Sequence, residues 1–181
     1  MIFTEASLKG AYIIDLEKRA DDRGFFARRW CAREFSSHGL SPDIAQVNVG
    51  HSVRRGTLRG MHFQIAPYAE VKVVHCSRGA LYDVIIDLRD ESPTRGQWLG
   101  MELTAENGRM LYVPEGFAHG YQTLQDETDL VYRTSQFYAP DAARGVRYDD
   151  RAFGIVWPLP VTVISAEDRS WPDYCGAGQA P

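Results

Sequence analysis

Short apolar runs, several of them alternating strictly with polar residues, recur along this chain. Alternation with a period of two is typical of strands. The runs end at turn-forming residues such as Ser77-Arg-Gly79, Ser92-Pro93 and Asn107-Gly108, which are frequent between strands. The pattern predicts strands at Ala11–Leu16, Gly24–Trp30, Ile44–His51, Thr57–Gln64, Val71–Arg78, Ala80–Leu88, Gln97–Thr104, Arg109–Val113, Ala118–Thr123 and Asp129–Thr134.

Helical signals are scarce. Ala32–His38 alone predicts a helix of useful length, and Gly39 follows it as a stop. From about Ser165 the chain is aperiodic and contains Pro and Gly, which predicts a partly irregular tail. Many short strands with little helix predict an all-β sandwich, jelly roll or barrel. The length of 181 residues and the lack of an internal repeat predict a single domain, 1–181.

Composition narrows the classes of partner. The chain is 44% hydrophobic with a net charge of −4, so it has enough apolar side chains for a core and no basic excess for nucleic acid or a membrane surface. No basic-then-apolar leader opens the sequence and no apolar run approaches the length of a membrane span. Cys31, Cys76 and Cys175 form no CxxC pair, so we expect reduced, packed thiols and a cytoplasmic location.

Candidate chemistry centres on Gly56–Gln64, which places Arg59 and His62 in an otherwise apolar strand. By itself His62 is most simply interpreted as a structural histidine. Strict alternation would also put Arg59 and His62 on opposite faces of the strand. Gly60 lies between them and is a candidate for a β-bulge that turns one side chain to the other face.

Three further residues have ordinary interpretations when taken alone. Lys72 shares a strand face with Val74, and a lysine at such a position is most often solvent-exposed. Inside a barrel, however, it would need an anionic partner or a lowered pKa. Tyr132 is typical of a strand tyrosine, and Asp168 of a turn or cap residue.

His119 lies in the sequence Pro114-Glu-Gly-Phe-Ala-His119. This P-x-G-x-x-H pattern resembles the second motif of the cupin superfamily, whose members are small jelly rolls. Metal-binding cupins also need two histidines two residues apart in a first motif, and here the partner of His62 is Gln64. An amide is a poor ligand for a transition metal, so we expect no metal site and no cofactor.

Together these segments resemble the dTDP-4-dehydrorhamnose 3,5-epimerase family from about Asp21 to Asp168. The resemblance implies a cupin-type jelly-roll barrel, a homodimer, and an isomerase that needs neither a metal nor an organic cofactor. The segments that carry it are Asp22-Arg-Gly-Phe-Phe26, Gln46-Val-Asn48, Gly56–Gln64, Lys72, Asp83–Leu88, Ser92-Pro-Thr94, Glu115-Gly-Phe-Ala-His-Gly120, Tyr138-Ala-Pro140, Asp149-Asp150 and Gly154-Ile-Val-Trp-Pro158.

The resemblance also implies roles for individual residues. His62 would be the general base, Asp168 its orienting carboxylate and Tyr132 the general acid. Lys72 and His119 would line the reacting sugar. Contacts to the rest of a nucleotide-linked sugar would come from Arg23, Phe26, Gln46, Asn48, Arg59 and Tyr138.

These residue types suit proton transfer next to a ketone. A 4-keto sugar has acidic protons at carbons 3 and 5, because the carbanion delocalises onto the ketone oxygen. An imidazole removes a proton at neutral pH, and a phenol on the opposite face returns one. The function that the resemblance implies is inversion of carbon 3, carbon 5 or both in a nucleotide-linked 4-keto-6-deoxy sugar, in deoxysugar (rhamnose-type) biosynthesis.

The chain departs from the family pattern at Arg28, Ala143 and Glu167, which correspond to the substrate periphery. The identity of the nucleotide base, the identity of the sugar and the number of inverted centres therefore stay open. One alternative is a single-centre epimerase acting on a CDP- or GDP-linked sugar. A second is a sugar-binding cupin without turnover, and a third is a metal-dependent cupin oxygenase, against which Gln64 counts.

Overall fold

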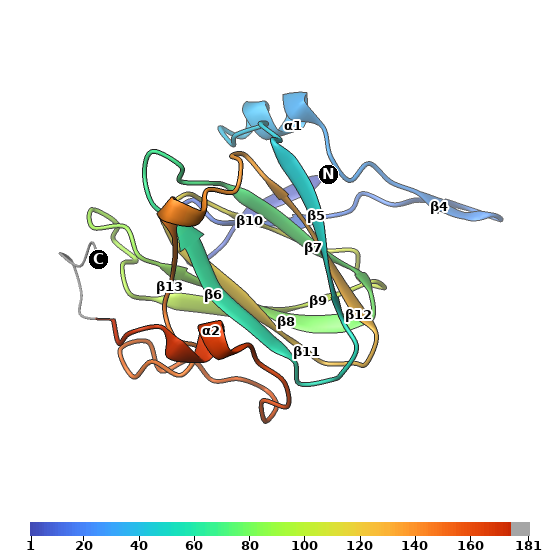
Figure 1. Cartoon of the computed structure of the whole chain (residues 1–181). Coiled ribbons are helices and arrows are strands. Elements are labelled where there is room, and N and C mark those ends of the chain that lie inside the picture. Colours follow the sequence, from blue (N-terminus) through green and yellow to red (C-terminus); the bar gives the residue numbers. More distant parts are fainter. Residues whose placement is uncertain (175–181) are drawn as a thin grey trace.

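The structure is a computed structural model that describes residues 1–174. It is built almost entirely from antiparallel strands (Figure 1). The strands are β1 (Ile2–Glu5), β2 (Tyr12–Asp15), β3 (Arg19–Asp21), β4 (Gly24–Phe26), β5 (Gln46–Ser52), β6 (Leu58–Gln64), β7 (Lys72–Arg78), β8 (Ala80–Asp87), β9 (Trp98–Thr104), β10 (Met110–Val113), β11 (Phe117–Thr123), β12 (Thr128–Thr134) and β13 (Ala143–Gly145). The helices are α1 (Ala32–Ser37), a 3₁₀ turn η1 (Pro140–Ala142) and α2 (Ala166–Ser170).

Two sheets face each other and form a jelly-roll barrel of the cupin type. The first sheet has the order β1-β2-β10-β7-β12-β5, and the second has the order β13-β6-β11-β8-β9. Strands far apart in sequence are neighbours, since β6 pairs with β11 and β7 pairs with β12. The expectation of an all-β barrel is confirmed.

Three apolar clusters hold the layers together. Leu81, Ile85, Leu111 and Leu130 pack between the two sheets. Helix α1 covers the outer face of the first sheet, where Phe35 is fully buried in a second cluster. The chain after β13 covers the outer face of the second sheet and forms the third cluster there, with Met61, Val84, Ile86, Ala118, Val146 and Phe153. Burial of this kind stabilises by roughly 25 cal/mol per Å² of apolar surface.

Strand β6 contains the bulge that Gly60 indicated. His62 pairs with His119, but Arg59 pairs with Tyr121, so two residues of β6 (Gly60 and Met61) lie opposite one of β11 (Gly120). The bulge turns Met61 into the outer cluster and lets both Arg59 and His62 face the cavity. Only glycine fits here, since a Cβ on Gly60 would lie 2.5 Å from the Cα of Gly120 and its φ is +128°.

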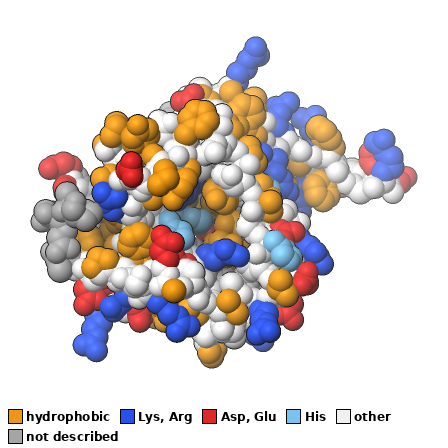
Figure 2. Space-filling view, in the orientation of Figure 1, with side chains coloured by type: hydrophobic (Ala, Val, Ile, Leu, Met, Phe, Trp, Pro, Cys, Tyr) orange, Lys and Arg blue, Asp and Glu red, His pale blue; other side chains and the backbone are white. Residues whose placement is uncertain are grey.

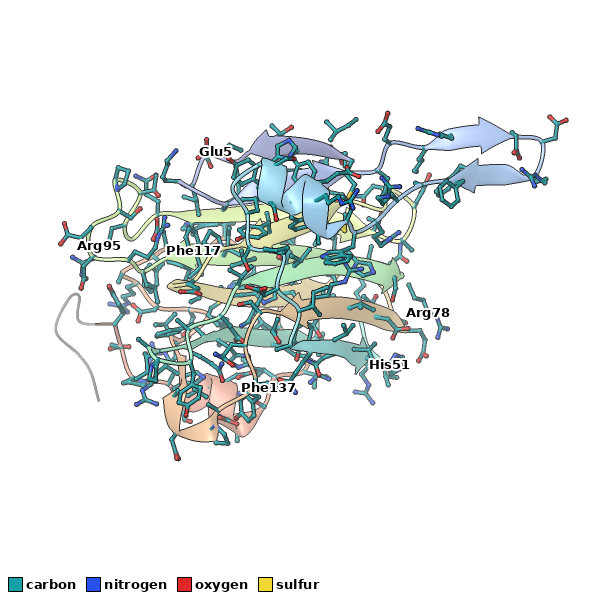
Figure 3. The ribbon with its side chains drawn as sticks, turned by 90° about the horizontal axis from the view of Figure 1, so that it is seen from above. Glu5, His51, Arg78, Arg95, Phe117 and Phe137 are labelled. Atoms are coloured by element: carbon teal, nitrogen blue, oxygen red, sulfur yellow. The ribbon has the colours of Figure 1, made fainter. Side chains whose placement is uncertain are left out.

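The observed elements differ from the expected ones at both ends of the chain. The expected strand Gly24–Trp30 is much shorter, and β4 pairs only with β3. These two strands form an arm that projects from the barrel (Figure 3). The tail expected to be irregular contains α2, whose first turn is capped by the Ser165 side chain.

Of the cysteines expected to be packed and reduced, Cys76 is buried, Cys31 is half-buried and both are free. Cys175 lies outside the described residues. No helix within residues 1–174 is long and apolar enough to cross a membrane.

Candidate active site

A cavity of about 910 Å³ opens between the two sheets. Figure 2 shows this opening as a hollow with histidine surface at its centre and acidic and hydrophobic side chains around it. The cavity brings together every predicted site residue except Arg23 and Phe26. Its wall includes Gln46, Asn48, Arg59, His62, Lys72, His119, Tyr132, Tyr138 and Asp168.

His62 and Asp168 form a close pair although 106 positions separate them in the sequence. The Nε2 of His62 lies 2.6 Å from Oδ1 of Asp168. The other carboxylate oxygen accepts the Gly60 N–H at 3.2 Å, and the Asp168 N–H donates to the Ser165 Oγ at 3.0 Å. Helix α2 therefore presents an anchored carboxylate to the imidazole.

The environment of Asp168 keeps its carboxyl group ionised. Burial alone would raise the pKa of Asp168. The hydrogen bond and charge of His62, together with the bonds from Gly60 and Ser165, outweigh burial and hold the pKa below its usual value. An ionised carboxylate accepts the Nε2–H of His62, which leaves Nδ1 with a free lone pair. The exposed fraction of the His62 side chain is 47%, so this nitrogen is accessible to a substrate.

Tyr132 lies on the opposite wall. It belongs to β12 in the first sheet, whereas His62 belongs to β6 in the second. Burial raises the pKa of the Tyr132 hydroxyl, the charge of Glu70 raises it further, and the charge of Arg59 opposes them. The Tyr132 hydroxyl is therefore neutral at physiological pH.

Lys72 is buried on the inner face of β7, although a lysine in this pattern is most often exposed. Its Nζ donates to the carbonyl oxygen of His62 at 3.2 Å and lies 3.2 Å from a carboxylate oxygen of Glu70. The side chains of Lys72 and Glu70 are 10% and 11% exposed. A buried ammonium thus reaches the cavity with its anionic partner beside it.

His119 is held by a second carboxylate. Its Nε2 lies 2.8 Å from Oδ1 of Asp83 on β8, and both side chains are buried. Because Asp83 fixes Nε2, the Nδ1 of His119 is the nitrogen left for a ligand. His119 pairs directly with His62 across β11 and β6, so the two imidazoles are neighbours.

Further polar side chains line the cavity along β5 and at the start of β6. The guanidinium of Arg59 donates to the carbonyl oxygen of His51 at 2.9 Å and approaches Ser52 Oγ at 3.4 Å. On β5, Gln46 and Asn48 face inward. Gln46 also accepts the N–H of Tyr138 at 2.8 Å, which ties that aromatic residue to the rim.

Arg23 and Phe26 lie elsewhere in this chain. Both belong to the projecting β3–β4 arm, and neither contributes to the cavity wall. The Phe26 residue is 73% exposed, and the Arg23 side chain pairs locally, with Asp21 at 2.6 Å. Within this chain the two residues therefore lie apart from the other predicted site residues, and their contact with a substrate stays a prediction.

The Gln64 side chain forms hydrogen bonds with the backbone of neighbouring loops. Its amide nitrogen donates to the carbonyl oxygens of Tyr68 and Phe137, and its oxygen accepts the N–H of Ala139. These bonds tie the loop after β12 to β6. Among residues 1–174 no group of three or more His, Cys, Asp or Glu side chains is arranged to hold a metal ion.

Sequence reasoning missed several residues of the cavity wall. Glu70 carried a signal, because it lies two positions before Lys72 and so shares its face. Arg144 and Trp171 carried none, since their places depend on how β13 and α2 pack. Trp171 lies against Gly145, where a Cβ would meet the indole ring at 2.3 Å.

The three departures from the family pattern differ in position. Arg28 pairs with Glu34 at 2.8 Å, outside the cavity wall. Ala143 and Glu167 both line the cavity. The departures at Ala143 and Glu167 therefore alter the part of the cavity wall that a ligand would meet.

A cupin-type barrel with a histidine–carboxylate pair on one wall and a tyrosine on the other defines an acid–base enzyme of the epimerase class. Comparison with known proteins gives the particular family. The model of the dTDP-4-dehydrorhamnose 3,5-epimerase family matches residues 5–175. The chain belongs to the dTDP-4-dehydrorhamnose 3,5-epimerase family, an isomerase family, as its sequence motifs implied.

The chain resembles individual members along most of its length. It is 41% identical to the dTDP-4-dehydrorhamnose 3,5-epimerase of Sinorhizobium fredii over 176 residues, covering 97% of this chain and 90% of the relative. A Bacillus anthracis dTDP-4-dehydrorhamnose 3,5-epimerase solved with TDP and PPi is 38% identical, with a TM-score of 0.92 and coverage of 96% and 99%. A 3'-monoepimerase from Streptomyces bikiniensis, solved with dTDP-quinovose, is 34% identical, with a TM-score of 0.84 and coverage of 93% and 85%.

Proposed function

We propose that this protein inverts carbon 3, carbon 5 or both in a dTDP-linked 4-keto-6-deoxy sugar. The observation that carries the proposal is the placement of His62 and Tyr132 on opposite sheets across one cavity. Inversion of a carbon centre requires a proton to leave from one face and another to arrive at the opposite face. A base and an acid on facing walls meet this requirement.

The first step is removal of a proton. The Nδ1 of His62 takes the proton from the carbon next to the ketone, and the C–H electron pair moves into the ring to form an enolate. The ionised Asp168 stabilises the resulting imidazolium and fixes the ring. The Lys72 ammonium, which donates to the backbone carbonyl oxygen of His62, would offset the negative charge that develops on the enolate oxygen.

The second step returns a proton from the other wall. The Tyr132 hydroxyl donates to the same carbon while the enolate electron pair returns to it, and the ketone is restored. The phenolate and the imidazolium then exchange protons with water. General acid–base steps of this kind are worth roughly 10²–10⁴-fold each.

The nucleotide diphosphate would lie towards Arg59, Gln46 and Asn48. A guanidinium matches phosphate oxygens in geometry and charge, and Tyr138 at the rim offers a flat face for the base. The relatives solved with TDP and with dTDP-quinovose support a thymidine nucleotide.

We infer further that the protein acts as a homodimer in which the β3–β4 arm reaches the partner. Edge strand β5 exposes Val47 and Val49, at 59% and 66%, and an exposed apolar edge of this kind invites a second chain. The arm exposes Phe25 and Phe26, at 56% and 73%, and neither residue lines the cavity of this chain. In such a dimer Arg23 and Phe26 would complete the partner's site.

The test is incubation of purified protein with dTDP-, CDP- and GDP-linked 4-keto-6-deoxy sugars in deuterated water, with NMR of the protons at carbons 3 and 5. We expect loss of proton signal and an inverted product with the dTDP sugar. Binding without any exchange would identify a sugar-binding cupin instead. Proton exchange with a CDP- or GDP-linked sugar alone would show that the proposed thymidine nucleotide is wrong.

A single-centre epimerase is the second candidate, and the resemblance to the 3'-monoepimerase from Streptomyces bikiniensis favours it. The same experiment separates the two, because inversion at one carbon leaves the other with its original configuration.

A further inference from the structure

Glu70 is a carboxylate in the wall of the active-site cavity with no role in the proton transfers described above. It lies just before β7, two residues ahead of Lys72, so the two side chains share one face. Its Oε1 is 3.2 Å from the Lys72 Nζ, and the Glu70 side chain is only 11% exposed. A carboxylate buried this deeply is costly unless it is paired, so its place beside a buried ammonium points to a function.

Glu70 also belongs to the surroundings of Tyr132. Strand β12 pairs with β7 so that Tyr132 lies opposite Val74 and Thr134 lies opposite Lys72. Tyr132 and Lys72 are therefore diagonal neighbours on one inner face, with Glu70 beside Lys72. The titratable and charged groups that line the same cavity from the other elements include Arg59 and His62 on β6, His119 and Tyr121 on β11, and Asp168 on α2.

We propose that Glu70 is a positioning residue that anchors the Lys72 ammonium at the cavity wall and holds Tyr132 in its neutral, proton-donating form. The inference rests on the proposed epimerase function, and it explains why the charge of Lys72 in that site is paired with a carboxylate. Lys72 has two fixed partners, Glu70 and the carbonyl oxygen of His62. A flexible ammonium is thereby aimed at the position where the enolate oxygen forms.

The effect on Tyr132 has a definite sign. Burial is the main cause that raises the pKa of the Tyr132 hydroxyl, and the negative charge of Glu70 raises it further, because a second anion nearby disfavours phenolate. Arg59 acts in the opposite direction. Removal of the Glu70 charge therefore lowers the pKa of Tyr132, and the proton donor is lost at a lower pH.

The experiment compares Glu70→Gln with Glu70→Asp and with Glu102→Gln. Glutamine keeps the size and a hydrogen-bond acceptor for Lys72 but removes the charge, and aspartate keeps the charge. Glu102 lies exposed on β9, outside the cavity wall, and serves as the control. For each protein the rate of inversion and the rate of proton exchange in deuterated water are measured against pH, after subtraction of exchange without enzyme.

In Glu70→Gln we expect the alkaline limb of the inversion profile to move to lower pH, because the negative charge that disfavours phenolate is gone. We also expect slower exchange at all pH values, since Lys72 loses its anchor. Glu70→Asp should keep the limb closer to that of the parent, and Glu102→Gln should match the parent in both rates.

An alkaline limb that stays in place in a folded Glu70→Gln protein would overturn the inference, even if the rates fall, because a purely structural role changes rates without moving a pH limb. If Glu70→Gln does not fold, as judged by circular dichroism, Glu70→Asn removes the same charge and takes its place. The proposed function itself is judged separately, by inversion in the parent protein, so the two failures are distinguishable.

Discussion

At the scale of single residues, His62 is the base on which the proposed proton transfers depend. His62→Asn keeps a similar shape and removes the proton acceptor, so proton exchange and inversion should both fall by roughly 10²-fold or more. Both rates are measured by NMR in deuterated water. His51→Asn is a matched control, since His51 is an exposed histidine paired with Asp129. Near-parental turnover in a folded His62→Asn protein would remove His62 from the mechanism.

Gln64 leads to a second prediction at this scale. Its amide is committed to three backbone groups, and an amide is a weak ligand for transition metals. Protein treated with a chelator and then freed of it should therefore invert its substrate at the parental rate. Recovery of activity only after addition of iron, zinc or manganese would contradict this.

Single residues also show how far the residues of the cavity wall can be predicted from sequence. His62, Lys72, Tyr132 and Asp168 could be named in advance, because they are unusual residues in apolar strands or match a known pattern. Asp83 had no such signal as the partner of His119. Its role appears only when β8 and β11 pair in a register that joins the two side chains.

At the scale of elements, the turn after β8 is fixed by a buried carboxylate. Asp87 accepts hydrogen bonds from Arg89, Ser92 and Thr94. Burial alone would raise the pKa of Asp87, but these bonds outweigh it and lower the pKa to about 2. The Arg89 guanidinium also lies over the Phe117 ring and donates to the carbonyl oxygen of Lys9, so the turn is tied to the N-terminal segment.

Asp87→Asn should therefore destabilise the fold at neutral pH. The pKa of Asp87 falls from 3.8 to about 2 on folding, which corresponds to about 2 kcal/mol of stability. Because the folded pKa is the lower one, this stability is present above about pH 4 and is lost as the pH falls towards about 2. Urea unfolding of parent and variant should show a gap at pH 7 that narrows in acid. A gap independent of pH would contradict the assignment.

Elements differ in how far their sequence determines them. The period-two pattern predicted the strands of the two sheets except the short edge strands β1 and β13, and Gly60 indicated the bulge in β6. Helix α2 was missed because a helix of five residues has too little periodicity to detect. The end of β4 was missed because an arm that leaves the barrel has the same local pattern as a strand within it.

At the scale of the whole molecule, we expect a homodimer that covers the exposed face of β5. Val47→Asp places a charge on that face, opposite Arg133 in the ladder. Because the new carboxylate can pair with Arg133, the monomer should stay folded. The same charge on the exposed face of β5 should weaken the dimer. Sedimentation at micromolar concentration should show a dimer for the parent and dissociation for the variant, with loss of activity.

Val156→Asp is the control for this prediction, because Val156 is 71% exposed in the chain after β13. It should sediment as the parent does. A fully active parental monomer would contradict both the dimer and the role of the arm.

The most direct measurement for the account as a whole is made on Tyr132→Phe, because the central claim is that the two sheets supply the base and the acid separately. The variant loses only the phenolic proton. His62 still removes a proton and Lys72 still offsets the enolate charge, so solvent deuterium should still enter the substrate, returned from the face of His62. We predict exchange near the parental rate with little inverted product. Equal loss of exchange and inversion, or inversion at the parental rate, in a folded variant would contradict the account.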